Sequence, residues 1–179
     1  MSKAPTPTGI ERTFSQRDVL ITKTDLDDVI TYVNKAFLRV MGYTEDEVLG
    51  QTHEMFLDPG RPRSLSGVLT EIERAGREVF SYVPYLTRSG DHVWVISQSA
   101  VMRDANGQIV GHHTVDRAPD RETIPIISGL HARLREEERR HGGGQAGAAA
   151  GLKVFQETLA AQGMTYEEYV WAIAKEDLE

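Results

Sequence analysis

Apolar and polar residues alternate in several short segments of the chain, and this period of two predicts β-strands. The alternation is clear over residues 18–25, and β-branched and aromatic residues fill residues 29–33. Asp27 and Asp28 lie between these segments and favour a turn, so the two strands are expected to form a hairpin. Three further strands are predicted over residues 78–88, 92–104 and 108–116. The Asn106-Gly107 pair is a strong hairpin signal before the last strand.

A period of three to four residues in the apolar positions predicts helices between and after the strands. Asn34 can cap a first helix that Gly42 ends, and a capping box at residues 44–47 begins a second. Longer amphipathic helices are expected at residues 64–75, at residues 121–140 and, broken at Gly163, after residue 152. Two strands, several short helices and a three-stranded meander predict an α+β domain with an antiparallel sheet.

Composition divides the chain into five parts: a flexible N-terminal tail (1–13), a folded domain (14–118), a connecting helix (119–141), a Gly/Ala linker (142–151) and a C-terminal helical unit (152–179). The tail is rich in Pro and Thr, and the linker reads GGGQAGAAAG, which is typical of a flexible segment. The terminal unit has too little core to fold alone. It should therefore dock on the domain, on a second copy or on a partner.

Charge and composition narrow the function classes. The 179 residues include 20 Lys and Arg against 27 Asp and Glu, a net charge of −7, which argues against nucleic acid as the main partner. The sequence contains neither an apolar run of about 18 residues nor a secretory leader, so we expect a cytoplasmic protein without a membrane span. The absence of cysteine excludes disulfides, iron–sulfur clusters, thiolate haem ligation and thiol catalysis. Signature motifs of enzymes are also missing.

Three segments occur in an order and spacing that carry a family resemblance: TDLDDVITYVNKAFLRVMGYTEDEVLGQTHEM, RSGDHVWV and QIVGHHTV, the last followed by Arg117-Ala118. Together they resemble a PAS sensor domain, most closely the aerotaxis-receptor type, over residues 14–118. The resemblance implies the PAS fold, a curved five-stranded antiparallel sheet with short helices and a pocket between them. Such a pocket holds FAD, haem, a small molecule or only side chains.

Domains of the aerotaxis-receptor type usually hold FAD, but several flavin-contacting positions of that family are changed here. Leu57-Asp58 stands where the family has an Arg-His pair, and Gly60 stands where it has an aspartate. Val79 takes the place of a tryptophan, and Tyr85 takes the place of an asparagine. FAD needs donors for its ring carbonyls and cationic or amide partners for its pyrophosphate. The FAD determinants are therefore largely substituted, and the cofactor stays open between FAD, haem and another ligand.

The candidate cofactor-binding residues are His53, Asn34, Trp94, His112, Thr114, Asp116, Tyr85 and Leu57. His53 begins a short helix where, in some oxygen-sensing PAS domains, a histidine ligates haem iron. It could instead cap that helix or bond a loop carbonyl. Strand alternation and the analogy with flavin PAS domains predict that His112, Thr114 and Asp116 face the pocket.

Plainer structural roles are open for several of these residues. Asn34 could simply cap its helix without contacting the pocket. Trp94 could simply be a packing residue of the central strand without contacting a cofactor. His112 can be a hydrogen-bonded core residue or a proton-sensitive group that contacts the ligand. His53 and His112 could also bind a metal together with Asp58, although the spacing specifies no such site.

The sequence thus predicts a sensory module of signal transduction, responding to a redox, oxygen or energy cue. A change in the pocket would alter hydrogen bonds to the last two strands and move residues 119–140. The C-terminal helices would then signal within a homodimer or to a signalling partner. The alternative is a structural adaptor with an unliganded PAS domain that mediates protein–protein interaction. A small enzyme that uses His53 and Asp58 is a third hypothesis.

Overall fold

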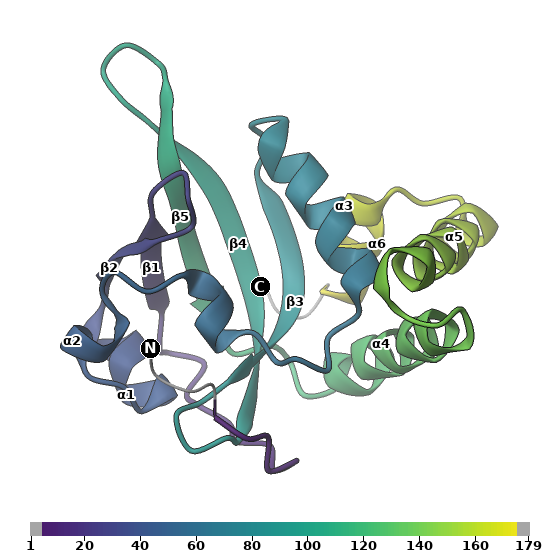
Figure 1. Ribbon diagram of the computed structural model, residues 1–179, viewed down its shortest axis with the longest axis horizontal. Helices are drawn as coiled ribbons and strands as arrows, with labels where there is room; N and C mark the ends of the chain where they lie inside the picture. Colours follow the sequence, from purple (N-terminus) through teal and green to yellow (C-terminus); the bar gives the residue numbers. More distant parts are fainter. Residues whose placement is uncertain (1–4, 175–179) are drawn as a thin grey trace.

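A five-stranded antiparallel sheet lies at the centre of the computed structural model, which describes residues 5–174 (Figure 1). The strands are neighbours in the order β2-β1-β5-β4-β3. In chain order they are β1 (Leu20–Thr24), β2 (Ile30–Val33), β3 (Val79–Leu86), β4 (His92–Arg103) and β5 (Ile109–Arg117). This arrangement confirms the predicted α+β class and the predicted hairpins.

Helices occupy two stretches of the chain, one between β2 and β3 and one after β5. The first stretch holds α1 (Lys35–Met41), α2 (Glu45–Val48), the 3₁₀ helix η1 (His53–Phe56) and α3 (Arg63–Arg74). The second holds α4 (Thr123–Arg140), α5 (Gly144–Gln162) and α6 (Tyr166–Ile173). Asn34 caps α1, because its Oδ1 accepts a hydrogen bond from the Phe37 amide at 2.9 Å. The capping boxes that begin α2 and α6 also form as expected.

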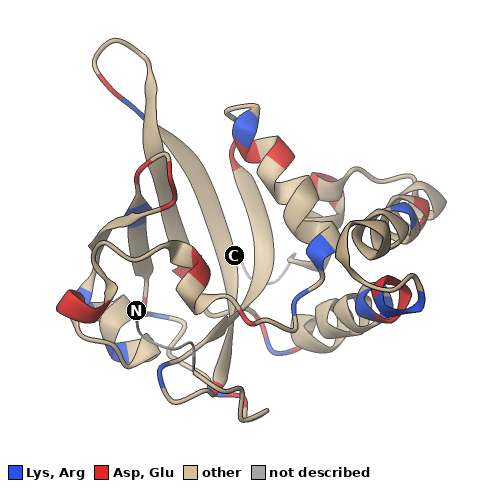
Figure 2. Cartoon of the chain, in the orientation of Figure 1, with Lys and Arg blue, Asp and Glu red and all other residues tan. Residues whose placement is uncertain are grey.

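Each face of the sheet has an apolar core of its own. Val93 and Val95 of β4 pack with residues of α1, α2 and η1 on one face. Trp94 and Ile96 of the same strand pack with residues of α4, α5 and α6 on the other. Successive residues of a strand point to opposite faces, so β4 contributes to both cores. In Figure 2 the charged residues lie on helices, turns and strand ends, and the middle of β3, β4 and β5 carries none.

The prediction of a flexible linker over residues 142–151 is wrong, because helix α5 begins at Gly144. Gly142, Gly143 and Gly144 all have positive φ and make the tight turn from α4 into α5. Farther along, a Cβ atom on Gly147 would lie 2.5 Å from the Glu138 carbonyl oxygen. The glycines therefore allow a sharp turn and a close approach of two helices, and they do not act as a spacer.

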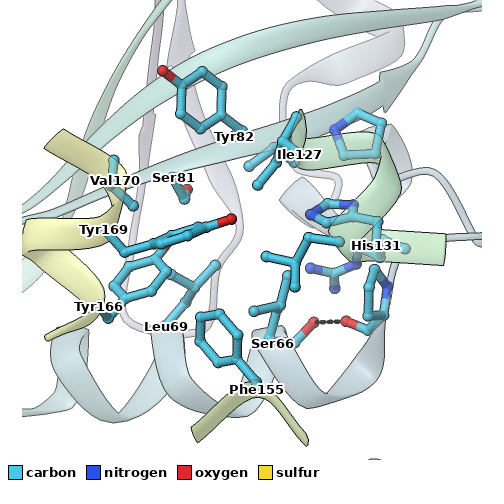
Figure 3. A pocket seen from close by; sticks show the side chains of 16 residues that line it. Ser66, Leu69, Ser81, Tyr82, Ile127, His131, Phe155, Tyr166, Tyr169 and Val170 are labelled. Carbon is cyan, nitrogen blue, oxygen red and sulfur yellow. Dashed lines mark hydrogen bonds between the residues drawn. The ribbon is translucent and has the colours of Figure 1, made fainter. Parts of the chain in front are cut away.

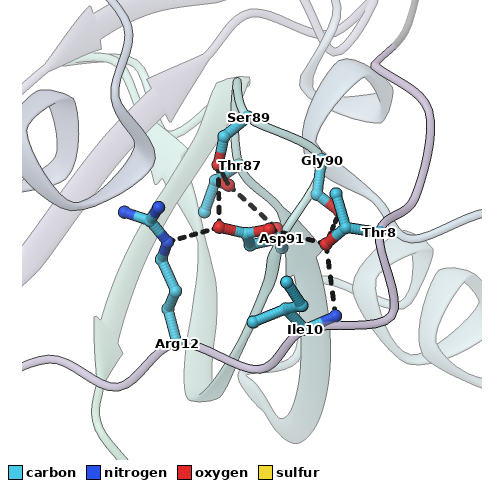
Figure 4. Close-up of polar contacts among 7 residues, drawn as sticks. All are labelled: Thr8, Ile10, Arg12, Thr87, Ser89, Gly90 and Asp91. Carbon is cyan, nitrogen blue, oxygen red and sulfur yellow. Dashed lines mark hydrogen bonds and ion pairs between the residues drawn. The ribbon is translucent and has the colours of Figure 1, made fainter.

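The N-terminal segment also differs from the predicted flexible tail. Residues 1–4 lie outside the described residues, but the Thr8 amide donates to the Gly90 carbonyl and the Arg12 amide to the His92 carbonyl, each at 2.8 Å. The buried Asp91 carboxylate accepts from the Thr8 hydroxyl and from the Arg12 guanidinium (Figure 4). These two bonds lower the pKa of Asp91. The segment is thus fastened across the β3–β4 turn.

Among the helices of residues 5–174, none combines the length and the apolar character that crossing a bilayer requires.

Candidate ligand-binding cleft

A cleft of about 530 Å³ lies between the sheet and the helices on the face opposite Trp94. Its floor comes from β1, β3, β4 and β5, and its walls come from the β1–β2 turn, η1 and α3. In Figure 1 the β1–β2 hairpin and α3 lie on either side of β5 and β4. The volume is in the range that small-molecule sites have in proteins.

Hydroxyl groups form most of the cleft floor. The strand register places Thr22, Thr114 and Ser99 opposite one another across β1, β5 and β4. Two residues farther along β5, Asp116 lies opposite Ser97 of β4. Of the threonines on β1, Thr24 lines the cleft with a side chain that is only 4% exposed. The Thr24 Oγ1 atom has no hydrogen-bond partner in the protein, although buried polar groups normally have one. The floor can therefore still bond a polar ligand.

Asp116 lies fully buried beneath this floor. Burial raises its pKa to about 7, while the nearby hydroxyls of Ser97 and Tyr85 oppose that shift. Neither hydroxyl makes a hydrogen bond of good geometry with the carboxylate, so both Asp116 oxygens are without a partner. Burial and the neighbouring Asp116 charge in turn raise the pKa of Tyr85. The carboxyl group is therefore poised to change its protonation state near neutral pH.

His53 forms part of the wall. Its ring packs edge-on against Phe56 and Tyr85, each with centroids 5.6 Å away. Burial, and then the positive charge of Arg61, lower the pKa of His53 to about 4, so the imidazole is neutral at pH 7. Its Nε2 atom is buried and has no hydrogen-bond partner. His53 thus offers the cleft one unused polar atom in an aromatic setting.

Charged side chains of both signs lie at the rim. Asp28 has φ of 61° in the β1–β2 turn, and burial, then the charge of Glu73, raise its pKa to about 6. Burial lowers the pKa of the half-buried Arg61, which lies in the loop before α3. Asp27 and Arg74 complete the set of charged residues at the rim.

A family model described as "PAS domain" matches residues 17–116, which end in β5 just beyond the cleft floor. The chain belongs to the PAS domain family. The matched residues, here called the PAS core, include β1 to β4, all of β5 but its last residue, and the elements that form the walls of the cleft. The resemblance seen in the sequence is thereby confirmed.

Two curated relatives are similar in sequence to a large part of this chain. The chain is 31% identical over 146 residues to the aerotaxis receptor of Escherichia coli K12, covering 80% of this chain and 29% of the receptor. It is 26% identical over 114 residues to the blue-light-activated histidine kinase of Brucella canis, covering 61% of this chain and 22% of the kinase. The chain thus spans less than a third of these relatives.

Solved structures show the same fold. A light-oxygen-voltage domain studied with a flavin analogue superposes with a TM-score of 0.55 at 19% identity, over 66% of this chain and 88% of that one. The light state of the aureochrome 1 light-oxygen-voltage domain superposes with a TM-score of 0.54 at 21% identity, over 68% of this chain and 93% of that one. At such identities the likeness concerns the fold alone.

The PAS core brings together most of the residues that the sequence singled out. His53, Leu57, Tyr85, His112 and Thr114 line the cleft. Asp116 lies under its floor on the same strand face as His112 and Thr114, as strand alternation predicts.

Two predicted residues do not line this cleft. Trp94 lies on the opposite face of the sheet, where its ring centroid is 5.3 Å from that of His131 in α4. Asn34 uses its side chain to cap α1 and to donate from Nδ2 to the Val19 carbonyl at 2.8 Å. Both residues have the structural roles that were the alternatives, a helix cap for Asn34 and packing for Trp94.

The sequence reasoning missed the charged rim and part of the hydroxyl floor. Arg61 belongs to the segment HEMFLDPGRP, which continues after η1 as an irregular loop in which no periodic pattern marks the residues that face the cleft. The metal site that His53, His112 and Asp58 could have formed is not seen, since no group of three His, Asp or Glu residues in positions 5–174 is placed to hold an ion. Asp58 instead accepts a hydrogen bond from the Gly60 amide at 2.6 Å and shapes the loop.

The cofactors that the PAS family suggests find few partners here. The pyrophosphate of FAD would meet the carboxylates of Asp27, Asp28 and Glu73 beside the cations of Arg61 and Arg74, so the rim does not suit two phosphates. Haem needs an apolar cavity for its macrocycle, but the floor carries hydroxyls. We therefore assign neither group to the cleft.

Helix α3 separates this cleft from a second, narrow pocket of about 30 Å³ (Figure 3). Arg61, Ser66 and Leu69 line both spaces, and the far side of the narrow pocket consists of residues from α4, α5 and α6. His131 lies there with a buried Nε2 that has no partner, and burial lowers its pKa to about 4. One helix thus touches the cleft on one side and the C-terminal helices on the other.

The first turn of α3 is held by a residue of α4. The Glu138 carboxylate accepts from the Ser64 amide at 2.8 Å, from the Ser64 hydroxyl at 2.7 Å and from the Arg63 amide at 3.2 Å. A carboxylate at a helix N-terminus satisfies free amides and complements the helix dipole. In addition, Arg135 donates to the Gly60 carbonyl at 2.9 Å. The wall of the cleft and the C-terminal helices are therefore tied by polar contacts.

Proposed function

We propose that this PAS domain is a sensory module that binds a small polar ligand in the cleft and passes the change to its C-terminal helices. The observation that carries the proposal is the presence of buried polar atoms without partners in the lining of one cavity, Thr24 Oγ1 and His53 Nε2. Leaving such groups unpaired costs about 1–3 kcal/mol each. A ligand that pairs them would recover part of this free energy.

The route of the signal would be α3. A ligand contacts the face of α3 that carries Leu69 and Glu73, while the same helix packs against α5 and takes its N-terminal cap from Glu138. A shift of α3 would therefore change its contacts with α4 and α5. Such a response needs a ligand whose affinity differs between the two positions of the helix.

A cleft-filling variant tests the binding step. Ser99→Leu places a larger side chain on the floor, whereas Ala100→Leu places it on the opposite face of the same strand. In a thermal-shift screen of metabolites, at least one compound should raise the Tm of the wild-type chain and of Ala100→Leu but not that of Ser99→Leu. Hydrogen exchange in residues 123–162 should change on adding that compound. The visible absorption spectrum shows whether a flavin or haem accompanies the protein.

The second candidate is the structural adaptor, and exposed apolar residues on the C-terminal helices favour it. Ile126 is 51% exposed and Trp171 is 38% exposed. A chain that responds to no compound in the screen, yet self-associates or captures a partner through these residues, would be an adaptor. Light scattering at increasing concentration measures the self-association that a homodimer requires.

A further inference from the structure

The cleft holds opposite charges that do not pair with one another. Asp28 projects from the β1–β2 turn, Glu73 from the end of α3, and Arg61 from the loop before α3. Within residues 5–174, none of these three side chains forms an ion pair or a hydrogen bond. By contrast, the nearby Arg135 side chain has a partner, because it donates a hydrogen bond to the Gly60 carbonyl. The three groups are therefore free to bind something else.

Partial burial makes these free charges unfavourable. Burial raises the pKa of Asp28 to about 6 and lowers the pKa of Arg61, so in both cases the charged form is disfavoured. Desolvated charges are normally paired or hydrogen-bonded. A ligand with a positive group near the carboxylates and a negative group near the guanidinium would satisfy both ends at once.

A second observation concerns hydrogen-bonding groups that the cleft offers to the body of the ligand. Thr24 is nearly buried, lies on the floor of the same cleft and has an Oγ1 atom without a partner. His53 contributes a neutral imidazole whose Nε2 is also unused. The floor therefore offers hydrogen bonds to a polar ligand in addition to the charges at the rim.

Other ligand classes leave part of this arrangement unpaired. A phosphate ester would face the rim carboxylates, and a simple amine would leave Arg61 without a partner. A divalent cation lacks three suitably placed ligands in the part of the chain that the structure describes. An uncharged sugar would leave charges of both signs desolvated.

We propose that the cleft binds a small zwitterion of the free amino-acid class, with its ammonium at Asp28 and Glu73 and its carboxylate at Arg61. The assignment rests on the proposed sensory function and names the chemistry of its ligand. Arg favours carboxylates because its guanidinium can donate two parallel hydrogen bonds.

The experiment is isothermal titration of the full chain with single L-amino acids, each compared with its amide and with its deaminated acid. At least one amino acid should bind, and both analogues should bind at least about tenfold more weakly, because each lacks one charge-assisted contact. Arg61→Gln should weaken the binding of the amino acid but not the binding of its amide. Asp28→Asn should weaken the binding of the amino acid but not the binding of the deaminated acid. The substitution keeps the backbone conformation, because asparagine tolerates the positive φ at this position.

Two substitutions serve as matched controls. Glu71→Gln removes a carboxylate from the exposed side of α3, and Arg77→Gln removes an exposed guanidinium just after that helix. Both should leave amino-acid affinity unchanged. An amide that binds as tightly as its amino acid, or an Asp28→Asn variant with unchanged affinity, overturns the assignment. If no amino acid binds while Ser99→Leu still abolishes the response to another metabolite, the ligand class fails and the sensory function stands. If nothing binds at all, both fail.

Discussion

Asp116 is a carboxyl group that the protein keeps out of water without a good hydrogen bond. Its pKa of about 7 lies well above the value of about 3.9 expected in the unfolded chain. The folded protein therefore holds more protons at this group than the unfolded chain between those two values. By linkage, the contribution of Asp116 to stability is present below about pH 4 and is lost as the pH rises through 7.

Asp116→Asn isolates this effect. The variant should match the wild type in stability near pH 4 and exceed it near pH 8, by at most roughly 4 kcal/mol, since an amide has no proton to lose. The difference between the two urea-unfolding free energies should be measured across that range. The wild-type profile alone is not diagnostic, because the buried His53 and His131 act in the opposite direction below pH 6.5. A difference that does not change with pH would contradict the assignment.

At the scale of residues, strand alternation accounts for what the sequence could predict of the cleft. His112 and Thr114 line it because they are two apart on β5, and the pattern shows that directly. Alternation also separates Trp94 from Val95, but it does not say which of the two faces the ligand. That depends on where α4 packs. Arg61 lies in an irregular loop, and no periodicity predicts the direction of a loop side chain.

Helix α5 depends on two glycines that its neighbours approach closely. Gly147 lies against the Glu138 backbone, and a Cβ atom on Gly151 would lie 2.8 Å from the Ser64 hydroxyl. By contrast, Gly129 in α4 has open space around its Cα, although it too is in a helix. The same residue type therefore has opposite energetic roles in two adjacent helices.

Alanine substitutions should reveal this difference. Gly147→Ala forces backbone atoms apart and should destabilise the protein by about 1–3 kcal/mol. Gly129→Ala should stabilise it by about 0.5–1 kcal/mol, because alanine has the higher helix propensity and nothing opposes its methyl group. The midpoint of urea unfolding measures both changes. Equal effects of the two substitutions would show that α5 does not pack against α4 as described.

At the scale of elements, the sequence predicted each strand and most helices because caps and hydrophobic periodicity agree there. It failed at residues 142–151, where glycine and alanine gave no periodic signal and a flexible linker was the natural interpretation. The close contact at Gly151 involves Ser64 of α3, which is distant in the sequence, and the contact at Gly147 involves Glu138 of the preceding helix, which the glycine turn brings back against α5. Local composition cannot report such contacts.

Across the whole molecule, the N-terminal segment and the C-terminal helices both fold back onto the PAS core. The N-terminal segment crosses the β3–β4 turn and is anchored at Asp91 by Thr8 and Arg12 (Figure 4). Ser89 also donates to this carboxylate at 3.0 Å. One carboxylate thus binds both Thr8 and Arg12, in addition to the backbone bonds that these two residues make with Gly90 and His92.

Asp91→Asn should release this segment. Limited trypsin digestion should then cut after Arg12 faster than in the wild type, because the guanidinium has lost its charged partner. Asp18→Asn serves as the comparison, since it breaks the exposed pair with Arg39 and leaves Asp91 intact. It should digest at the wild-type rate. Equal digestion of all three proteins would show that Asp91 does not hold the segment.

The sequence could predict the α+β class and the PAS core but not how the remaining third of the chain is arranged. The terminal helices were expected to dock on the domain, on a second copy or on a partner, and the apolar residues alone did not decide among these. The structure shows them on the domain, where Phe155 and Tyr169 join the core that contains Trp94. The choice depended on shape complementarity between distant segments.

The cap that Glu138 gives to α3 bears on how this domain could be recombined with other proteins. The family match ends at residue 116, and a chimera joined just after β5 would carry the whole PAS core. It would, however, leave the Arg63 and Ser64 amides at the start of α3 without their acceptor. A functional graft must therefore extend through residue 138 or supply a carboxylate of its own. The segment to be transferred is thus longer than the segment that the family model matches.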